Sequence, residues 1–191
     1  MAWKGAAQLS NLTLNLLEQN EIYEQKDLVA EMSATASGEF ALEQSLNKVS
    51  QAWEGLPLPI MNHRNQKDLW ILADVADIIM MLEDRTVSIQ TMMGSRFISG
   101  IKEQVEVWEN KINLASDVLD EWLQVQRAWM YLENIFCAQD IQRQLPTESK
   151  KFFVVDKSFK ELMKNAYEDP NCIKRGCAPG VKEMMTQIGR A

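Results

Sequence analysis

One stretch decides the fold: residues 101–136 read IKEQVEVWENKINLASDVLDEWLQVQRAWMYLENIF. Mostly apolar side chains recur along it in steps of four and three, at Ile101, Val105, Trp108, Ile112, Ala115, Leu119, Trp122, Gln126, Trp129, Leu132 and Phe136. A mean step near 3.5 keeps them on one face of a helix that packs lengthwise against other helices. Unbroken, this helix would be about 55 Å long at 1.5 Å per residue. Asn113 and Ser116 are weak helix formers and favour a kink in its middle.

A second long helix is predicted upstream, from Glu21 to about residue 54. Asn20 can cap its first turn, because the Asn side chain accepts a hydrogen bond from a free backbone N–H. Gly38 costs about 1 kcal/mol relative to Ala and favours a kink. Residues 55–59 (GLPLP) end the helix, because two prolines in three residues cannot continue it. The apolar stripe of this helix comprises Leu28, Met32, Ala36, Leu42, Leu46, Val49 and Trp53.

The segment between these helices holds the strand candidate and a third helix. Residues 58–63 and 69–72 are short apolar pieces separated by polar residues, which predicts a β-hairpin over about 57–73. An isolated hairpin is marginal in water, so this one should pack on the helices or on a partner. A helix is predicted over residues 74–93, with Gly94 and Ser95 breaking it. Ser95 or Ser99 then caps the next element.

Downstream of Phe136 the pattern predicts three shorter helices. Thr147 can cap one that ends at Phe153, and Asp156 can cap a second that Asp169 and Pro170 stop. Residues 176–180 are predicted to be a loop, with Pro179 in the first turn of a last helix. That helix has Val181, Met184, Met185 and Ile188 on one face, and it reaches Arg190 and Ala191 without a terminator, as in a sequence cut from a longer one.

The fold class that follows is mostly α: an elongated bundle of long antiparallel helices with one small β-hairpin. Eight Gly and five Pro in 191 residues are few, which favours long helices over many short strands. We divide the chain into an N-terminal segment of unassigned fold, residues 1–20, and a helical domain over residues 21–191. Six Trp and eleven Met are interpreted as core anchors and gap fillers rather than a ligand box. Trp108, Trp122 and Trp129 should be buried anchors.

The charge excludes several classes of partner. A net charge of −7 and a pI near 4.9 repel nucleic acid and anionic membranes. The basic pairs at 150–151 and 174–175 are too short to overcome this repulsion. No window approaches the roughly 18 apolar residues of a membrane span, and residues 1–5 do not resemble a signal peptide. Three cysteines without a disulfide pattern suit a reducing compartment, so we expect a cytoplasmic protein.

The sequence predicts no catalytic, cofactor or metal site. His63 is the single histidine, and no nucleophile or carboxylate is tied to it by a motif. Cys172 and Cys177 are five apart in a predicted loop, whereas zinc sites repeat gaps of two to four and need four ligands, so Cys137 and His63 would have to join from far away. Glycine-rich phosphate loops are absent from the sequence. Adjacent carboxylates are expected on solvated faces: Glu83–Asp84 and Asp120–Glu121.

Residues 122–136 (WLQVQRAWMYLENIF), followed by Asp140-Ile141 and residues 144–148 (QLPTE), resemble the linker region of dynein heavy chains. The resemblance covers roughly residues 14–188. The Gln-Leu-Pro sequence at 144–146 and the Val-Asp-Lys sequence at 155–157 are more similar to axonemal than to cytoplasmic heavy chains. Further pieces similar to the family pattern are Leu16-Leu17, Ala36, Glu39, Trp53, residues 82–84, residues 93–95, Phe153, Asp156 and Phe159.

This resemblance implies a mechanical part of a motor. In dyneins the linker arches over a ring of AAA+ modules and bends and straightens with the nucleotide cycle to deliver the power stroke. The implied function is a non-catalytic lever-arm segment in microtubule-based motility, located in the cytoskeleton, in the axoneme of a cilium or flagellum. The implied partners are the AAA+ ring of the same heavy chain and other dynein subunits. Residues 1–5 depart from the family, and the last helix stops before the family pattern does.

Two alternatives to the lever arm are open at the level of the sequence. A free-standing helical scaffold or adaptor bundle would have acquired the apolar face of residues 101–136 by convergence and would be a cooperatively melting monomer. A severed linker piece should instead expose apolar surface and self-associate. A stand-alone enzyme has no residues in its favour.

Overall fold

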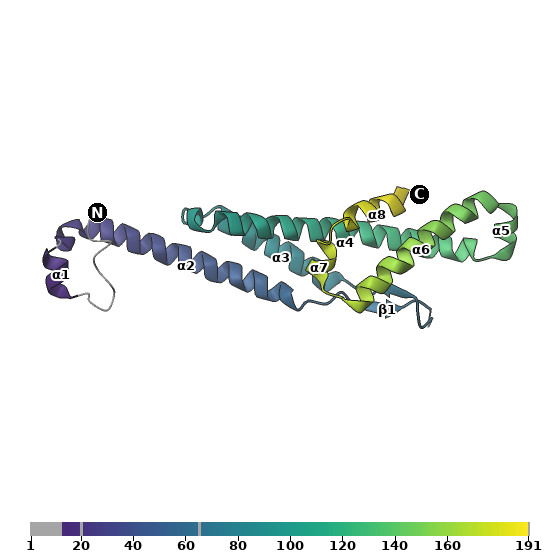
Figure 1. Cartoon of the computed structure of the whole chain (residues 1–191), viewed down its shortest axis with the longest axis horizontal. Coiled ribbons are helices and arrows are strands. Elements are labelled where there is room, and N and C mark those ends of the chain that lie inside the picture. Colours follow the sequence, from purple (N-terminus) through teal and green to yellow (C-terminus); the bar gives the residue numbers. More distant parts are fainter. Residues whose placement is uncertain (1–12, 20, 65, 191) are drawn as a thin grey trace.

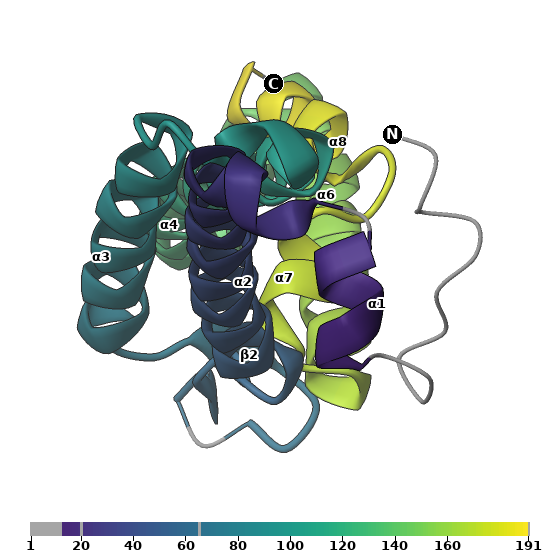
Figure 2. The same cartoon turned by 90° about the vertical axis from the view of Figure 1, so that its left-hand side faces the viewer.

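The structure is a computed structural model that describes residues 13–19, 21–64 and 66–190. It is elongated, with α2, α3 and α4 running side by side along the long axis and α6 crossing α4 (Figure 1). Figure 2, which looks along the long axis, shows these helices grouped as a bundle. The mostly α fold with one small hairpin is therefore confirmed. Its elements are α1 (Leu14–Gln19), η3 (Ile22–Gln25), α2 (Lys26–Glu54), β1 (Ile60–Asn62), β2 (Trp70–Leu72), α3 (Ala76–Met93), η4 (Ile98–Gly100), α4 (Lys102–Phe136), α5 (Gln139–Gln144), α6 (Pro146–Glu168), α7 (Cys172–Gly176) and α8 (Val181–Arg190).

Helix α4 is the central element, and α3, α6, α7 and α8 pack on it. It is one continuous helix through Asn113 and Ser116, and its 35 residues give a length of about 52 Å at 1.5 Å per residue. Helix α4 buries ten residues, and seven of them belong to the apolar face predicted from the sequence: Val105, Ile112, Ala115, Leu119, Trp122, Gln126 and Trp129. The other three, Val118, Val125 and Glu133, were not predicted.

The prediction that Trp108 is a buried anchor is only partly correct. Its side chain is only partly buried, and the Lys111 ammonium lies 4.8 Å from its ring centroid. Trp122 and Trp129 are 2% and 1% exposed, as predicted. Trp108 lies three residues after buried Val105 and four before buried Ile112, on the same helix face, so its partial exposure reflects incomplete covering of that face near the start of α4.

Helix α2 begins later than predicted and is only half covered. Glu21 has a left-handed backbone (φ 53°), so a 3₁₀ turn precedes the α-helix at Lys26; the proposed cap, Asn20, lies outside the described residues. The helix continues through Gly38, where an added Cβ would overlap the Phe97 ring. Trp53 is 1% exposed, whereas Met32 in the predicted stripe is 41% exposed. The stripe thus reaches a core only in its C-terminal half.

The predicted hairpin forms, with β1 and β2 antiparallel and Met61 paired with Ile71. Asn62 Nδ2 donates to the carbonyls of Gln66 and Lys67, at 2.9 and 3.1 Å, which holds the loop. Helix α3 follows two residues later than predicted, because Asp74 Oδ1 accepts from Ala76 N (3.0 Å) and starts the first turn there.

The C-terminal third differs from the prediction. One helix, α6, replaces the two predicted ones; Pro146 occupies its first turn and Asp156 lies in its middle rather than at a cap. It ends at Glu168, before Asp169 and Pro170, as predicted. The Cys172–Cys177 segment is not a loop, because Cys172–Gly176 forms α7, capped by Asn171 Oδ1 accepting from Lys174 N (2.8 Å).

Candidate functional site

Buried polar side chains join the hairpin to α4, and Gln126 makes the most direct connection. Its Oε1 accepts from Leu72 N at 2.7 Å and its Nε2 donates to Leu72 O at 2.9 Å. Leu72 and Gln126 are 2% and 7% exposed, so water cannot replace these bonds. The side-chain amide therefore satisfies the backbone N–H and C=O of Leu72 as a neighbouring strand would. This role explains why a polar residue occupies the apolar face of α4.

Trp129 joins α4 to α6. Its Nε1 donates to Asp156 Oδ1 at 3.0 Å, and its ring stacks on Phe159 with centroids 4.5 Å apart. The other carboxylate oxygen of Asp156 lies 2.8 Å from Lys160 Nζ. A carboxylate in the middle of a helix and only 9% exposed is tolerated because both oxygens have donors.

The hairpin loop is held at the C-terminal end of α4 by charge. Arg64 Nη1 lies 3.1 Å from Glu133 Oε2, and the guanidinium also donates to Asn134 Oδ1. His63 is 3% exposed; its Nε2 lies 3.7 Å from the same Glu133 oxygen, and its ring meets Trp129 edge-on. The structure thus places His63 in the interior as a packing residue beside a carboxylate. We call the set Gln126, Trp129, Glu133, Asp156, His63 and Arg64 the hairpin junction.

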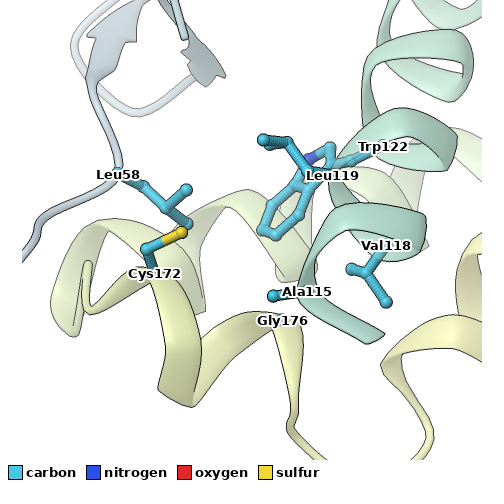
Figure 3. Close-up of a pocket in the computed structure, with 7 residues that line it drawn as sticks. All are labelled: Leu58, Ala115, Val118, Leu119, Trp122, Cys172 and Gly176. Atoms are coloured by element: carbon cyan, nitrogen blue, oxygen red, sulfur yellow. The ribbon is translucent and has the colours of Figure 1, made fainter. Parts of the chain in front are cut away.

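A second connection lies where α7 crosses α4. A Cβ on Gly176 would lie 3.1 Å from both Cα and Cβ of Ala115, so the two backbones approach closely. Beside this crossing Leu58 and Cys172 face Leu119 across a small cavity (Figure 3). The cavity holds only about 10 Å³ and is almost entirely apolar, so it offers a water molecule too few partners.

Burial disfavours the thiolate form of Cys172 and Cys177. Burial, with a smaller effect of the neighbouring Cys177, raises the pKa of Cys172 to about 11. Burial also raises the pKa of Cys177, whose Sγ donates to Lys111 O at 3.3 Å. Protonated thiols are poor nucleophiles and ligands. Within the ranges 13–19, 21–64 and 66–190, His, Cys, Asp and Glu side chains form no group of three that could hold a metal.

Two polar contacts connect helix α8 to α4. Lys182 Nζ donates to Asp117 Oδ2 at 2.7 Å, and this bond raises the pKa of Lys182. The Thr186 hydroxyl donates to the carboxylate of Glu121 at 3.1 Å. Of the four carboxylates predicted on solvated faces, Glu83, Asp84 and Asp120 are exposed. Glu121 is half-buried because α8 covers it.

Sequence reasoning did not identify the hairpin junction. Gln126 was visible only as a polar interruption of the apolar seam, and Asp156 was interpreted as a helix cap. A polar residue at a seam position was the one available signal. No helix in the described part of the chain combines the length and apolarity that crossing a membrane requires.

Comparison with known proteins shows that the sequence is similar to dynein heavy chains. Residues 4–190 match the family described as dynein heavy chain, N-terminal region 2. The chain is 41% identical to dynein axonemal heavy chain 6 of Homo sapiens over 172 residues, which are 90% of this chain and 4% of that protein. It is 35% identical to dynein axonemal heavy chain 12 of Rattus norvegicus over 174 residues, 91% of this chain and 5% of that protein. It is 36% identical to dynein axonemal heavy chain 10 of Homo sapiens over 167 residues, 86% of this chain and 4% of that protein.

Proposed function

This chain belongs to the dynein heavy chain family, and we propose that it is a segment of the mechanical linker, a lever arm without catalytic activity of its own. The chain spans 4–5% of the length of the relatives it matches. We assign ATP hydrolysis to an AAA+ ring elsewhere in the same heavy chain, with which this segment would move. Because the relatives are axonemal heavy chains, we assign the segment to the axonemal cytoskeleton.

The observation that carries this proposal is the hairpin junction at one end of a continuous helix. A lever transmits motion only if its parts do not slide past one another. Helix α4 runs 35 residues without a break, and Gln126 ties it to the hairpin by two buried hydrogen bonds. Trp129 ties it to α6 through Asp156. The hairpin, α4 and α6 would therefore move as one body.

The test is to release the hairpin without removing the helix. Gln126→Leu keeps the volume but leaves the buried N–H and C=O of Leu72 without partners, at a cost of about 1–3 kcal/mol each. In the complete heavy chain we expect slower microtubule gliding with ATP turnover retained. Met80→Ala, at a 62% exposed position of α3, is the matched control and should leave gliding unchanged.

Two measurements make the outcome decisive. Circular dichroism of the 191-residue chain checks that Gln126→Leu remains helical, and hydrogen exchange at residues 70–72 checks that the hairpin has loosened. Normal gliding by a motor whose hairpin exchanges freely would contradict the lever proposal. ATP hydrolysis by the purified 191-residue chain would contradict its non-catalytic part.

A further inference from the structure

The N-terminal half of α2 is a helix without a packing partner among the described residues. Every side chain from residue 26 to residue 34 is exposed, and the first buried one is Leu46. The rest of the molecule reaches this helix at Gly38, against Phe97, and at Glu39, against Gly100. Figure 1 shows α2 extending well past the turn between α3 and α4, and in Figure 2 this end points toward the viewer.

The exposed half carries the same apolar stripe as the buried half. Leu28 and Met32, 38% and 41% exposed, lie on the helix face that further along holds Leu46 and Trp53, 4% and 1% exposed. Val29, 41% exposed, widens the stripe on one side. The intrachain helix interface thus continues onto a surface that no described residue covers.

This continuation points to a helical occupant. A helix of about 12 residues is marginal in water on its own, so packing has to supply its stability. The covered half of α2 packs against helical neighbours, α3 and α7. A partner that extends the same interface would present apolar residues at steps of three and four.

Charge defines the partner further. Asp27 and Glu31 are four residues apart along one edge of the stripe, and Glu24 lies in the 3₁₀ turn η3 that leads into α2. They form no ion pair with any residue that the structure describes. Residues 21–34 contain four acidic side chains and one basic one, Lys26, which lies on the opposite side of the helix. Charges that flank a helix seam select partners of opposite sign.

We propose that the N-terminal half of α2 docks a basic amphipathic helix. The partner's apolar stripe packs on Leu28 and Met32, and lysines or arginines along one edge pair with Glu24, Asp27 and Glu31. This surface is spatially separate from the hairpin junction, because it lies at the opposite end of α2 from the segment that leads into the hairpin (Figure 1).

A pair of synthetic peptides tests the proposal with the 191-residue chain. Both are labelled three-heptad helices with leucine at the seam; one has lysine and the other glutamate at the flanking positions. Fluorescence anisotropy should show saturable binding of the lysine peptide, with the glutamate peptide about tenfold weaker because three attractions become repulsions. The double variant Asp27→Lys, Glu31→Lys should reverse this preference. A reversal shows that charge selects the peptide, whereas a loss of folding would weaken the binding of both peptides.

The remaining variants locate the site. Met32→Asp should abolish binding of the lysine peptide, while Met80→Asp on the outer face of α3 should leave it unchanged. Hydrogen exchange should show protection of residues 26–37 only when the lysine peptide is present. Equal binding of both peptides, binding that survives Met32→Asp, or protection of residues 26–37 by a second copy of the chain alone would each overturn the proposal.

Discussion

Separating Trp129 from Asp156 should reveal how firmly α6 is fixed to α4. Trp129→Phe removes the indole N–H that donates to Asp156 Oδ1 at 3.0 Å but retains an aromatic ring that can stack on Phe159. A hydrogen bond to a charged group contributes about 1.5–3 kcal/mol. The smaller ring also leaves a gap in a position that is 1% exposed. We therefore expect the free energy of unfolding to fall by about 2–4 kcal/mol.

The second variant makes the prediction specific to this bond. Asp156→Ala removes the acceptor and leaves the buried indole N–H unpaired, at a cost of about 1–3 kcal/mol. The ion pair with Lys160, whose side chain is 44% exposed, adds little because solvent screens it. The double variant lacks both donor and acceptor. Its destabilisation should therefore be smaller than the sum of the single ones by about 1–2 kcal/mol.

Urea unfolding followed by circular dichroism and tryptophan fluorescence measures all four proteins, provided that the two probes coincide. Pairing Trp129→Phe with Lys182→Ala is the control, because Lys182 bonds to Asp117 elsewhere on α4 and the effects should add to within about 0.5 kcal/mol. Additive effects of Trp129→Phe and Asp156→Ala would refute the buried bond as a connection between α4 and α6.

Two further predictions concern the crossing of α7 over α4. Gly176→Leu should lower the free energy of unfolding by about 1–3 kcal/mol, because its side chain would collide with Ala115. Gly55→Leu, where a Cβ would meet nothing within 4 Å, is the control, and equal melting temperatures of the two variants would contradict the close crossing. Iodoacetamide at pH 9 should alkylate exposed Cys137 and spare Cys172, whose pKa of about 11 keeps the thiol protonated, as peptide mass spectrometry would show. Rapid labelling of Cys172 in the folded protein would refute its burial. Because the pKa of this thiol is near 9 in the unfolded chain, the stability that buried Cys172 contributes is full below pH 9 and is lost as the pH rises through about 11.

Local pattern was sufficient for the long elements. The steps of four and three over residues 101–136 predicted α4 to within one residue, because a helix that buries one face along its whole length must repeat that face in sequence. The hairpin was predicted from two apolar pieces and a polar loop. Asn113 and Ser116 did not interrupt α4, because packing of the face outweighs their weak propensity.

What failed depended on residues far apart in the chain. Asp is a residue type that often caps helices, and only the Trp129 N–H, 27 residues away, explains why Asp156 lies inside α6. Gln126 and Leu72 are 54 residues apart, and no local pattern links a seam glutamine to a strand edge. Helix α7 has five residues, fewer than periodicity can detect. The stripe of α2 was predicted correctly as a stripe, but periodicity does not reveal whether the same chain covers it.

The two proposed surfaces lie far apart along the long axis of the molecule, which constrains how force could pass between them (Figure 1). The unpartnered half of α2 and the hairpin junction are connected through the covered half of α2 and through α3 and α4. Near the unpartnered end the Phe97 ring fills the space that a side chain at position 38 would occupy. Such a ring against a glycine blocks sliding of α2 along the α3–α4 turn, because any shift brings the ring against neighbouring side chains. If the segment is the lever arm that we propose, a load on the N-terminal half of α2 would enter the α3–α4 turn at this contact and pass along about 36 Å of α4, from Lys102 to Gln126, to the hairpin.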